Sequence, residues 1–280
     1  MRSAILVLAY AAPDILALHA RYLSGFDFLV HVDAKADLDN FAPAIGLPNV
    51  TLLPERLGVF WRGWSSVQAQ MMLLRAAVAR QYDRVVMISD DSFTLRAPVP
   101  LQDALALPGE RMEVRPAPDF RDRYDRFFFQ DSPATCRRGY NGTDRAFRIE
   151  DLDALQAMAA LMRQGKLPLE TLYFGQAWWS LTRASALLVL DAFDNRPHLR
   201  ESFRFSDCPD EHFVQNALSV GGSLPQPNRG PLMWADWKRD PKPYTLQTMA
   251  DILPALDGRH LFARKIRAPA LAKALMAHLG

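Results

Sequence analysis

Short apolar runs alternate with segments of helical periodicity over the first third of the chain, and this alternation limits the folds that are open to it. The apolar runs are residues 4–9, 28–32, 50–53 and 84–88. Such runs are typical of strands that a parallel sheet buries on both faces. Residues 13–23 and 65–82 lie between them and carry apolar side chains at three- and four-residue spacing. The pattern predicts an α/β fold, with an open and mostly parallel sheet flanked by helices.

The size of the chain and its lack of internal boundaries favour one domain. Of the 280 residues, 49% are hydrophobic, which is enough for a substantial core. No Gly/Ser linker, repeat or low-complexity block divides residues 1–280. Residues 108–148 show no clean period, so we predict an irregular segment there with a strand near Phe127. Helices are predicted over residues 150–162 and 182–193.

Charge and cysteine content exclude several classes of protein. The 33 Lys and Arg nearly balance the 31 Asp and Glu, so a nucleic-acid partner is not expected. Cys136 and Cys208 are the two cysteines, without the spacing of a disulfide framework or a zinc site, which favours a reducing, cytoplasmic location. The run at residues 4–9 is too short to span a bilayer. Residues 268–279 form a predicted helix whose few basic side chains favour packing on the domain over peripheral membrane contact.

Acidic residues follow two of the predicted strands. Asp33 comes directly after residues 28–32, and Asp90 and Asp91 follow residues 84–88. Ligands of open α/β sheets bind beyond the carboxyl ends of the strands, so these side chains are expected to line one pocket. Adjacent carboxylates are able to hold a divalent metal ion or to accept hydrogen bonds from loop amides. The sequence leaves both roles open for Asp90 and Asp91.

The segment around Glu211 has the pattern of a helix start. Asp207 or Cys208 is expected to be the N-cap and Pro209 the first helical residue, because an apolar-periodic run follows. Glu211 then lies in the first turn. An acidic residue there most often only complements the helix dipole, so this motif by itself favours a structural role.

Two further motifs have both a binding and a structural interpretation. Arg264 and Lys265 are adjacent cations suited to a diphosphate, but most short basic runs are solvated turns. Trp178 and Trp179 suit an aromatic platform for a sugar ring, but tryptophan within an apolar run more often fills a core. Neither motif decides the function by itself.

Taken in chain order, eight segments resemble the core-2/I-branching β-1,6-N-acetylglucosaminyltransferase family, which includes the peptide O-xylosyltransferases. The segments are residues 5–10, 30–35, 59–69, 88–95, 175–183, 209–213, 234–237 and 261–266. Each segment is modest alone, but eight in family order are specific, and they extend over nearly the whole chain.

The resemblance implies a GT-A-type, Rossmann-like sheet that binds a nucleotide sugar, and inverting transfer from a UDP-sugar. It implies that Glu211 is the general base and that Arg264 and Lys265 hold the donor diphosphate in place of a metal ion. The donor-binding half is then about residues 1–107, and the acceptor and catalytic half about residues 108–280. The resemblance further places Asp33, Asp90 and Asp91 at the donor pocket, and Trp178 and Trp179 near the acceptor.

This chain also departs from the family. Eukaryotic members are membrane-anchored and rich in disulfides, so the chain resembles a bacterial-type member. Residues 108–148 carry little resemblance, which leaves the acceptor, a glycan or another hydroxyl compound, unassigned. The expected donor is UDP-N-acetylglucosamine or UDP-xylose, with no cofactor and no metal. The alternatives are a catalytically decayed glycan-binding module and a metal-dependent enzyme that uses Asp90 and Asp91.

Overall fold

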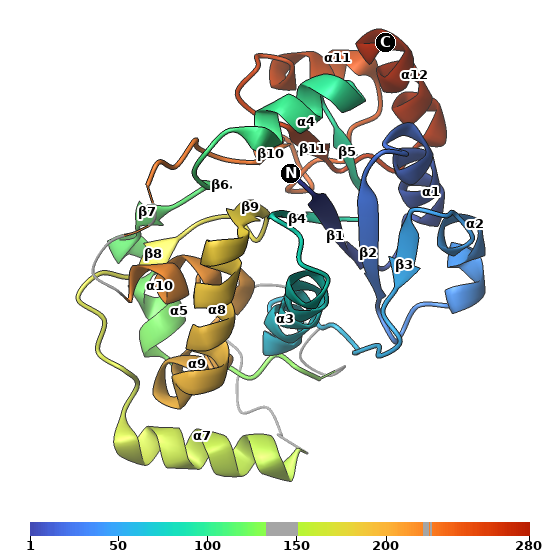
Figure 1. Ribbon diagram of the computed structural model, residues 1–280. Helices are drawn as coiled ribbons and strands as arrows, with labels where there is room; N and C mark the ends of the chain where they lie inside the picture. The colour runs from blue at the N-terminus through green and yellow to red at the C-terminus, as the bar shows by residue number, and fades with distance from the viewer. Residues whose placement is uncertain (133–150, 221–223, 225) are drawn as a thin grey trace.

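The computed structural model describes residues 1–132, 151–220, 224 and 226–280. Its main sheet has the strand order β3-β2-β1-β4-β9-β6 (Figure 1). These strands are β1 (Ser3–Ala9), β2 (Asp27–Val32), β3 (Val50–Leu52), β4 (Arg84–Ser89), β6 (Arg111–Met112) and β9 (Trp179–Thr182). The first four run parallel, whereas β9 is antiparallel to β4 and β6 to β9. The predicted α/β fold is confirmed, and the sheet is mixed because β9 and β6 join its edge in antiparallel pairs.

Alternation of side chains along β1 explains why helices cover both faces of the sheet. Ala4 and Leu6 face one core and Ile5 and Val7 face another, because successive side chains of a strand point to opposite faces. The first core is closed by α3 (Trp64–Ala79), α8 (Arg183–Asn195) and α10 (Phe213–Ser219). The second is closed by α1 (Pro13–Tyr22), α2 (Ala42–Ile45) and α4 (Pro98–Ala106). Asp33, Asp90 and Asp91, which follow the carboxyl ends of β2 and β4, are buried.

A smaller sheet packs against α1 and brings the end of the chain to the same region. Its order is β10 (Met233–Ala235), β11 (Phe262–Arg264) and β5 (Ser92–Thr94). The final helix, α12 (Pro269–Leu279), buries Leu271 and Leu275 against this sheet and α1, which confirms the predicted packing on the domain. Short helices α11 (Met249–Ile252) and η4 (Leu253–Ala255) precede it. No described helix combines the length and apolarity needed to cross a bilayer.

A third group of elements lies at the opposite end of the molecule from α12 (Figure 1). It contains β7 (Arg115–Pro116), η2 (Pro118–Phe120), α5 (Arg121–Asp125), α7 (Leu152–Gln164), β8 (Tyr173–Phe174) and α9 (Pro197–Arg204). The predicted helices at residues 150–162 and 182–193 are confirmed as α7 and α8. The strand predicted near Phe127 is wrong, because Phe127 and Phe129 pack irregularly against α7 and Phe205. Residues 133–148 of the predicted irregular segment, with Cys136, lie outside the described residues.

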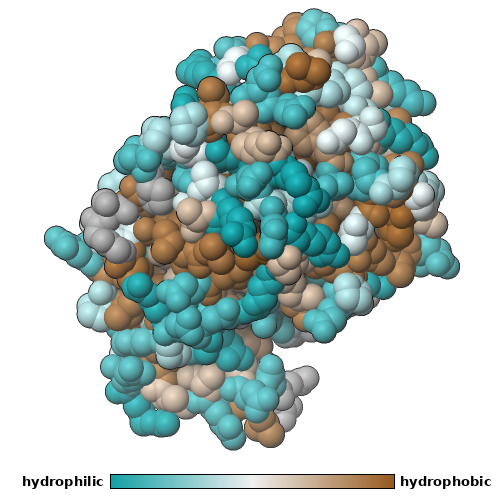
Figure 2. Space-filling view, viewed as in Figure 1, coloured by the Kyte–Doolittle hydropathy of each residue, from teal (hydrophilic) through white to brown (hydrophobic). Residues whose placement is uncertain are grey.

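Hydrophobic residues reach the surface in the region of α8 (Figure 2). Leu187 and Leu188 of this helix are exposed, while its Val189 and Leu190 are buried. The helix therefore contributes one face to the core, and its outer apolar residues take no part in the site described below.

Candidate active site

The segment that carries Glu211 is a tight turn rather than the start of a regular helix. Residues Pro209–Glu211 form the 3₁₀ helix η3, and α10 begins only at Phe213. Cys208 has a left-handed backbone (φ 49°), and no side chain caps η3. Of the two predicted N-cap residues, Cys208 holds the position, and Pro209 is the first helical residue as predicted. The carboxylate of Asp207 instead accepts two hydrogen bonds from Arg62, one of 2.6 Å between Nε and Oδ1.

Glu211 is a half-buried carboxylate with one guanidinium partner. Arg123 of α5 donates from Nη1 to Glu211 Oε2 at 2.7 Å, and the two side chains are 22% and 28% exposed. Burial raises the pKa of Glu211, while the charge and the hydrogen bond of Arg123 oppose the shift. A carboxylate with a raised pKa and remaining access to solvent suits a general base.

The pKa of Asp210, which precedes Glu211 in η3, is shifted by burial and by charged neighbours. Burial and then the charge of Glu211 raise the pKa of Asp210, whereas the charge of Arg264 lowers it. The segment 175–178 contacts both motifs, because Gly175 N–H donates to the backbone carbonyl of Glu211 at 2.9 Å and the ring of Trp178 stacks with Arg264. Glu211 and Arg264 are separated by about fifty residues of chain.

The two cations of the basic motif have different surroundings. Arg264 ends β11, pairs with Asp91 at 3.2 Å, and has its guanidinium carbon 4.7 Å from the centre of the Trp178 ring. Lys265 is half-buried, and within the described part of the chain its ammonium has no hydrogen bond or ion pair. Burial, followed by the charge of Arg264, lowers the pKa of Lys265. An unpaired, partly desolvated ammonium beside a guanidinium is able to bind an anion.

Asp90 and Asp91 are adjacent in sequence but have different partners. Asp90 Oδ2 accepts hydrogen bonds from the backbone N–H groups of Tyr10, Ala11 and Ala12 at 2.7–2.8 Å. It therefore holds the turn between β1 and α1, as the loop-amide interpretation predicts. Asp91 accepts a hydrogen bond from Ser89 at 2.7 Å and lies 3.5 Å from Arg267 as well as beside Arg264. These cations hold the pKa of Asp91 below its usual value, against the opposing effect of burial.

Neither carboxylate belongs to a larger group of metal-ligating side chains. Among the residues that the structure describes, no three or more His, Cys, Asp and Glu side chains gather in a way that would hold a metal ion. At this strand end, the side chains of Asp90 and Asp91 face donors and cations of the protein itself.

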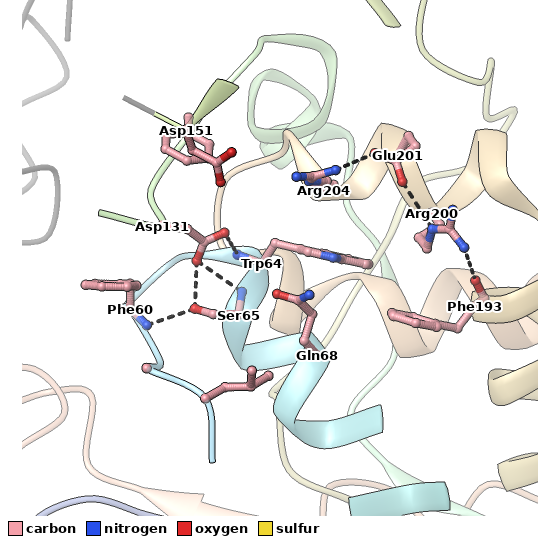
Figure 3. A pocket seen from close by; sticks show the side chains of 13 residues that line it. Phe60, Trp64, Ser65, Gln68, Asp131, Asp151, Phe193, Arg200, Glu201 and Arg204 are labelled. Atoms are coloured by element: carbon pink, nitrogen blue, oxygen red, sulfur yellow. Dashed lines mark hydrogen bonds and ion pairs between the residues drawn. The ribbon is translucent and has the colours of Figure 1, made fainter. Parts of the chain in front are cut away.

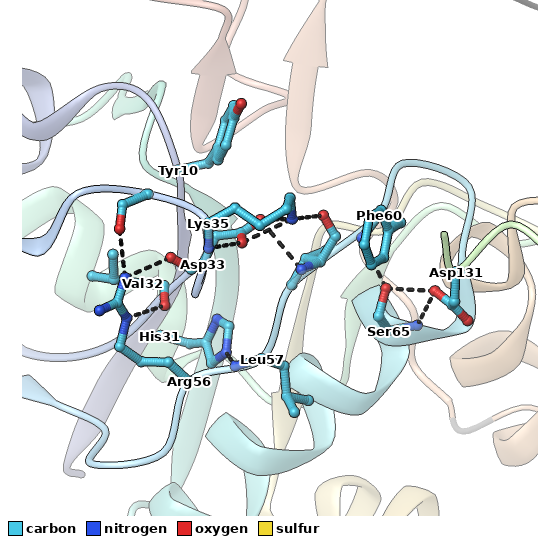
Figure 4. A network of polar contacts seen from close by, with 12 residues as sticks. Tyr10, His31, Val32, Asp33, Lys35, Arg56, Leu57, Phe60, Ser65 and Asp131 are labelled. Atoms are coloured by element: carbon cyan, nitrogen blue, oxygen red, sulfur yellow. Dashed lines mark hydrogen bonds and ion pairs between the residues drawn. The ribbon is translucent and has the colours of Figure 1, made fainter. Parts of the chain in front are cut away.

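Asp33, at the end of β2, is buried and bound to its own loop. Lys35 donates from Nζ to both carboxylate oxygens at 2.7 and 2.8 Å, and the Val59 N–H donates at 3.3 Å (Figure 4). The same lysine ammonium also donates to the carbonyl of Val59. Asp33 therefore joins the end of β2 to the segment that follows β3. Lys35 was not among the residues predicted for the site, because the sequence does not show that its ammonium turns back onto Asp33.

The two tryptophans of the predicted platform lie in different surroundings. Trp179 on β9 is 0% exposed and packs in the core, so its assignment to the acceptor is wrong for steric reasons. Trp178 is partly buried and stacks with Arg264, so it belongs to the side of the site that holds the basic motif. An acceptor contact of Trp178 stays a prediction.

Sequence reasoning did not identify Arg123 or Arg62. Arg123 lies in the segment without periodicity, and it meets Glu211 across 88 residues. Arg62 meets Asp207 across 145 residues. Residues 119–126 are rich in Arg and Asp, which indicates ion pairs in this segment. The sequence does not show which arginine pairs with which carboxylate.

A cavity of about 470 Å³ lies beside the site, next to the N-terminus of α3 (Figure 3). It is lined by Leu57, Gly58, Phe60, Trp64, Ser65, Gln68, Phe129, Asp131, Asp151, Phe193, Arg200, Glu201 and Arg204. Asp131 fixes its wall by accepting hydrogen bonds from Trp64 N–H at 3.0 Å and from the Ser65 hydroxyl at 2.6 Å. None of the predicted site residues lines this cavity.

Replacing Gly175 by alanine is expected to lower the free energy of unfolding by about 1–3 kcal/mol. Gly175 N–H donates to the backbone carbonyl of Glu211 at 2.9 Å. A Cβ on Gly175 would lie 1.8 Å from the carbonyl oxygen of Glu113, so the loop between β8 and β9 must move. Urea denaturation measures the change. Gly25→Ala is the matched control, because a Cβ there meets nothing within 4 Å; equal losses in both variants would contradict the prediction.

The chain matches no protein-family model, and no curated protein sequence matches it. Among solved structures it is similar to S. aureus TarS 1–349, with 15% identity and a TM-score of 0.38 over 81% of this chain and 57% of that one. It is also similar to S. aureus TarS 1–349 in complex with UDP-GlcNAc, with 16% identity and a TM-score of 0.28 over 38% of this chain and 30% of that one. In both comparisons the match spans less than two thirds of the TarS chain.

Proposed function

We propose that this protein is an inverting glycosyltransferase that transfers a sugar from a UDP-sugar to a hydroxyl group. The observation that carries the proposal is the segment 175–178, in which Gly175 N–H donates to the Glu211 carbonyl at 2.9 Å and Trp178 stacks with Arg264. This segment supports a candidate base and a candidate anion-binding pair that act together. The family resemblance of the eight ordered segments supports the same assignment.

The proposed reaction needs one group on each side of the sugar. Glu211 accepts the proton of the acceptor hydroxyl, whose oxygen then attacks the anomeric carbon. The bond from that carbon to the UDP oxygen breaks on the opposite face, so the configuration inverts and UDP leaves with the electron pair. In this proposal Arg264 and Lys265 stabilise the charge that develops on the β-phosphate. Preplaced donors of this kind contribute about 3–4 kcal/mol to a transition state.

Arg123 favours the charge state of Glu211 that a base requires. Burial favours the neutral carboxylic acid, which is unable to accept the proton. The guanidinium at 2.7 Å favours the carboxylate and also fixes the orientation of Oε2. Oε1 of Glu211 makes no hydrogen bond within the described part of the chain, so it is the oxygen that we assign to the acceptor hydroxyl.

We propose UDP-N-acetylglucosamine as the donor, with UDP-xylose as the alternative, and a reaction without a metal ion. Arg264 and Lys265 supply positive charge where a metal would otherwise act. In the metal-dependent alternative, Asp90 would have to give up three backbone hydrogen bonds and Asp91 its pairs with Arg264 and Arg267. A decayed glycan-binding module has no need for a half-buried carboxylate with a raised pKa, or for an ammonium without a partner among the described residues.

Release of UDP from each donor by the purified protein tests this function. We expect hydrolysis of one of the two UDP-sugars, and an equal rate in the presence of EDTA. Loss of the rate with EDTA and its return with manganese would favour the metal-dependent alternative. Neither binding nor turnover of either donor would contradict the proposed function.

A further inference from the structure

The segment between β3 and α3 presents a tryptophan to solvent. Trp61 is 62% exposed, whereas Trp64, three residues later, is 4% exposed. We call residues 57–63 the 57–63 loop. One end of this loop contacts the end of β2, and the other end contacts the segment that carries Glu211.

The first part of the 57–63 loop is bound to the end of β2. Leu57 N–H donates to His31 Nε2 at 2.9 Å, and Val59 N–H donates to Asp33 at 3.3 Å (Figure 4). The ammonium of Lys35 lies 4.6 Å from the centre of the Phe60 ring. This part of the loop therefore lies at the strand end proposed to hold the donor.

The last part of the 57–63 loop is bound to the segment that carries Glu211. Arg62 makes two hydrogen bonds with Asp207, and both side chains are nearly buried. Directly after the loop, the Trp64 ring meets the Phe213 ring edge to face at 5.2 Å. Asp207 precedes Glu211 by four residues, and its charge contributes to the raised pKa of Glu211. Trp61 is therefore next to a residue that is anchored to Asp207, four positions before the proposed base in the sequence.

Trp61 is held in a defined orientation although it is exposed. The guanidinium carbon of Arg62 lies 5.5 Å from the centre of the Trp61 ring, within the range of a cation–π interaction. The backbone of Arg62 is left-handed (φ 67°), which is unfavourable for a residue with a side chain. Strain of this kind persists where surrounding contacts impose one conformation, and here those contacts are the Asp207 hydrogen bonds.

We propose that Trp61 is the platform on which a sugar ring of the acceptor stacks, so that the acceptor is a saccharide. This inference rests on the proposed function and names its second substrate class. An exposed and oriented indole offers an apolar face to the C–H groups of a sugar ring at little cost in entropy. The hydroxyl to be activated then lies between the 57–63 loop and Glu211.

The cavity beside the same loop favours an uncharged saccharide. Phe60 and Trp64 belong to its wall, and the amide of Gln68 reaches into it without a hydrogen bond within the described residues (Figure 3). Its two guanidiniums, Arg200 and Arg204, both pair with Glu201, and Asp131 and Asp151 add two more carboxylates to the wall. Further sugar units of the acceptor would meet aromatic and hydrogen-bonding groups there, without the excess of positive charge that an anionic sugar would need.

Binding of methyl β-glycosides tests the inference. Methyl glycosides of glucose, galactose and N-acetylglucosamine are the probes, since an aromatic aglycone would itself stack on tryptophan. Saturation-transfer NMR, with UDP present, measures their binding to the wild type and to Trp61→Ala. We expect at least one glycoside to bind the wild type and its dissociation constant to rise about tenfold in Trp61→Ala. Trp61→Phe, which keeps an aromatic face, is expected to recover part of the affinity.

The controls separate this inference from the proposed function. Leu188→Ala removes an exposed apolar side chain of α8 and is expected to bind the glycosides as the wild type does. Hydrolysis of the UDP-sugar is measured on the wild type, and Leu188→Ala is expected to hydrolyse it at the wild-type rate. If hydrolysis is intact and no glycoside binds the wild type, or if Trp61→Ala binds equally well, the platform is disproved while the transferase assignment stands. If no UDP-sugar is hydrolysed, the proposed function itself fails.

Discussion

Replacing Glu211 by glutamine is expected to lower the rate of sugar transfer about 10²- to 10⁴-fold, with UDP binding largely unchanged. Glutamine keeps the shape of the side chain and a hydrogen bond at Arg123 through its carbonyl oxygen. Its amide is unable to take the proton of the acceptor hydroxyl. Transfer is measured by UDP release with a saccharide acceptor, and UDP binding by calorimetry.

Glu170→Gln is the matched control for this variant, because it removes the same charge from an exposed residue outside the site. The pH profile gives a second readout. The base acts only when it is ionised, so the wild-type rate falls as the pH drops through the pKa of Glu211, which burial places above that of an ordinary glutamate. The residual rate of Glu211→Gln is expected to lack this acidic limb. Near-normal transfer by the variant would exclude Glu211 as the base.

Replacing Lys265 by methionine is expected to lower kcat about 10²- to 10³-fold, comparable with the loss of one preplaced oxyanion donor. Methionine has nearly the same length and fills the same half-buried space, so the change removes the charge with little loss of packing. The ammonium has no partner within the described residues, and no protein carboxylate loses its ion pair in the variant. We expect the change in kcat rather than in KM, because negative charge develops on the leaving phosphate only during bond cleavage.

Steady-state kinetics with saturating donor measures this effect, and Lys273→Met on the exposed side of α12 is the control. A raised KM with an unchanged kcat would show that Lys265 binds the ground state and the transition state equally. That result would remove Lys265 from the role of stabilising the leaving group.

The sheet and its polar strand ends could be predicted because both follow from local pattern. A buried parallel strand requires a continuous apolar run, and Asp33 and Asp91 follow such runs directly. The partners of these acids could not be predicted in the same way. Asp91 meets Arg264 across 173 residues, and this pairing exists only after β11 has joined β5.

The shape of the Glu211 turn could not be predicted for a similar reason. Residues 207–213 have the composition of a helix N-terminus, and the sequence predicts Asp207 or Cys208 as its N-cap. Local propensity favours Asp207 of the two, but Cys208 holds the position. Arg62 provides a stronger partner for Asp207, since two charge-assisted hydrogen bonds form in a nearly buried position. A contact between distant parts of the chain thereby overrides the local preference. For Trp179 the local pattern was the better guide. Tryptophan within an apolar run most often packs in the core, and Trp179 does so.

The three hydrogen bonds from residues 10–12 to Asp90 have a consequence for how binding free energy is used. When a turn becomes ordered only on binding its ligand, the entropy cost of ordering the turn weakens the binding. Here one carboxylate already holds three successive amides at 2.7–2.8 Å. The backbone between β1 and α1 is therefore in place before any substrate binds, and interactions with the donor remain available to lower the barrier of the reaction.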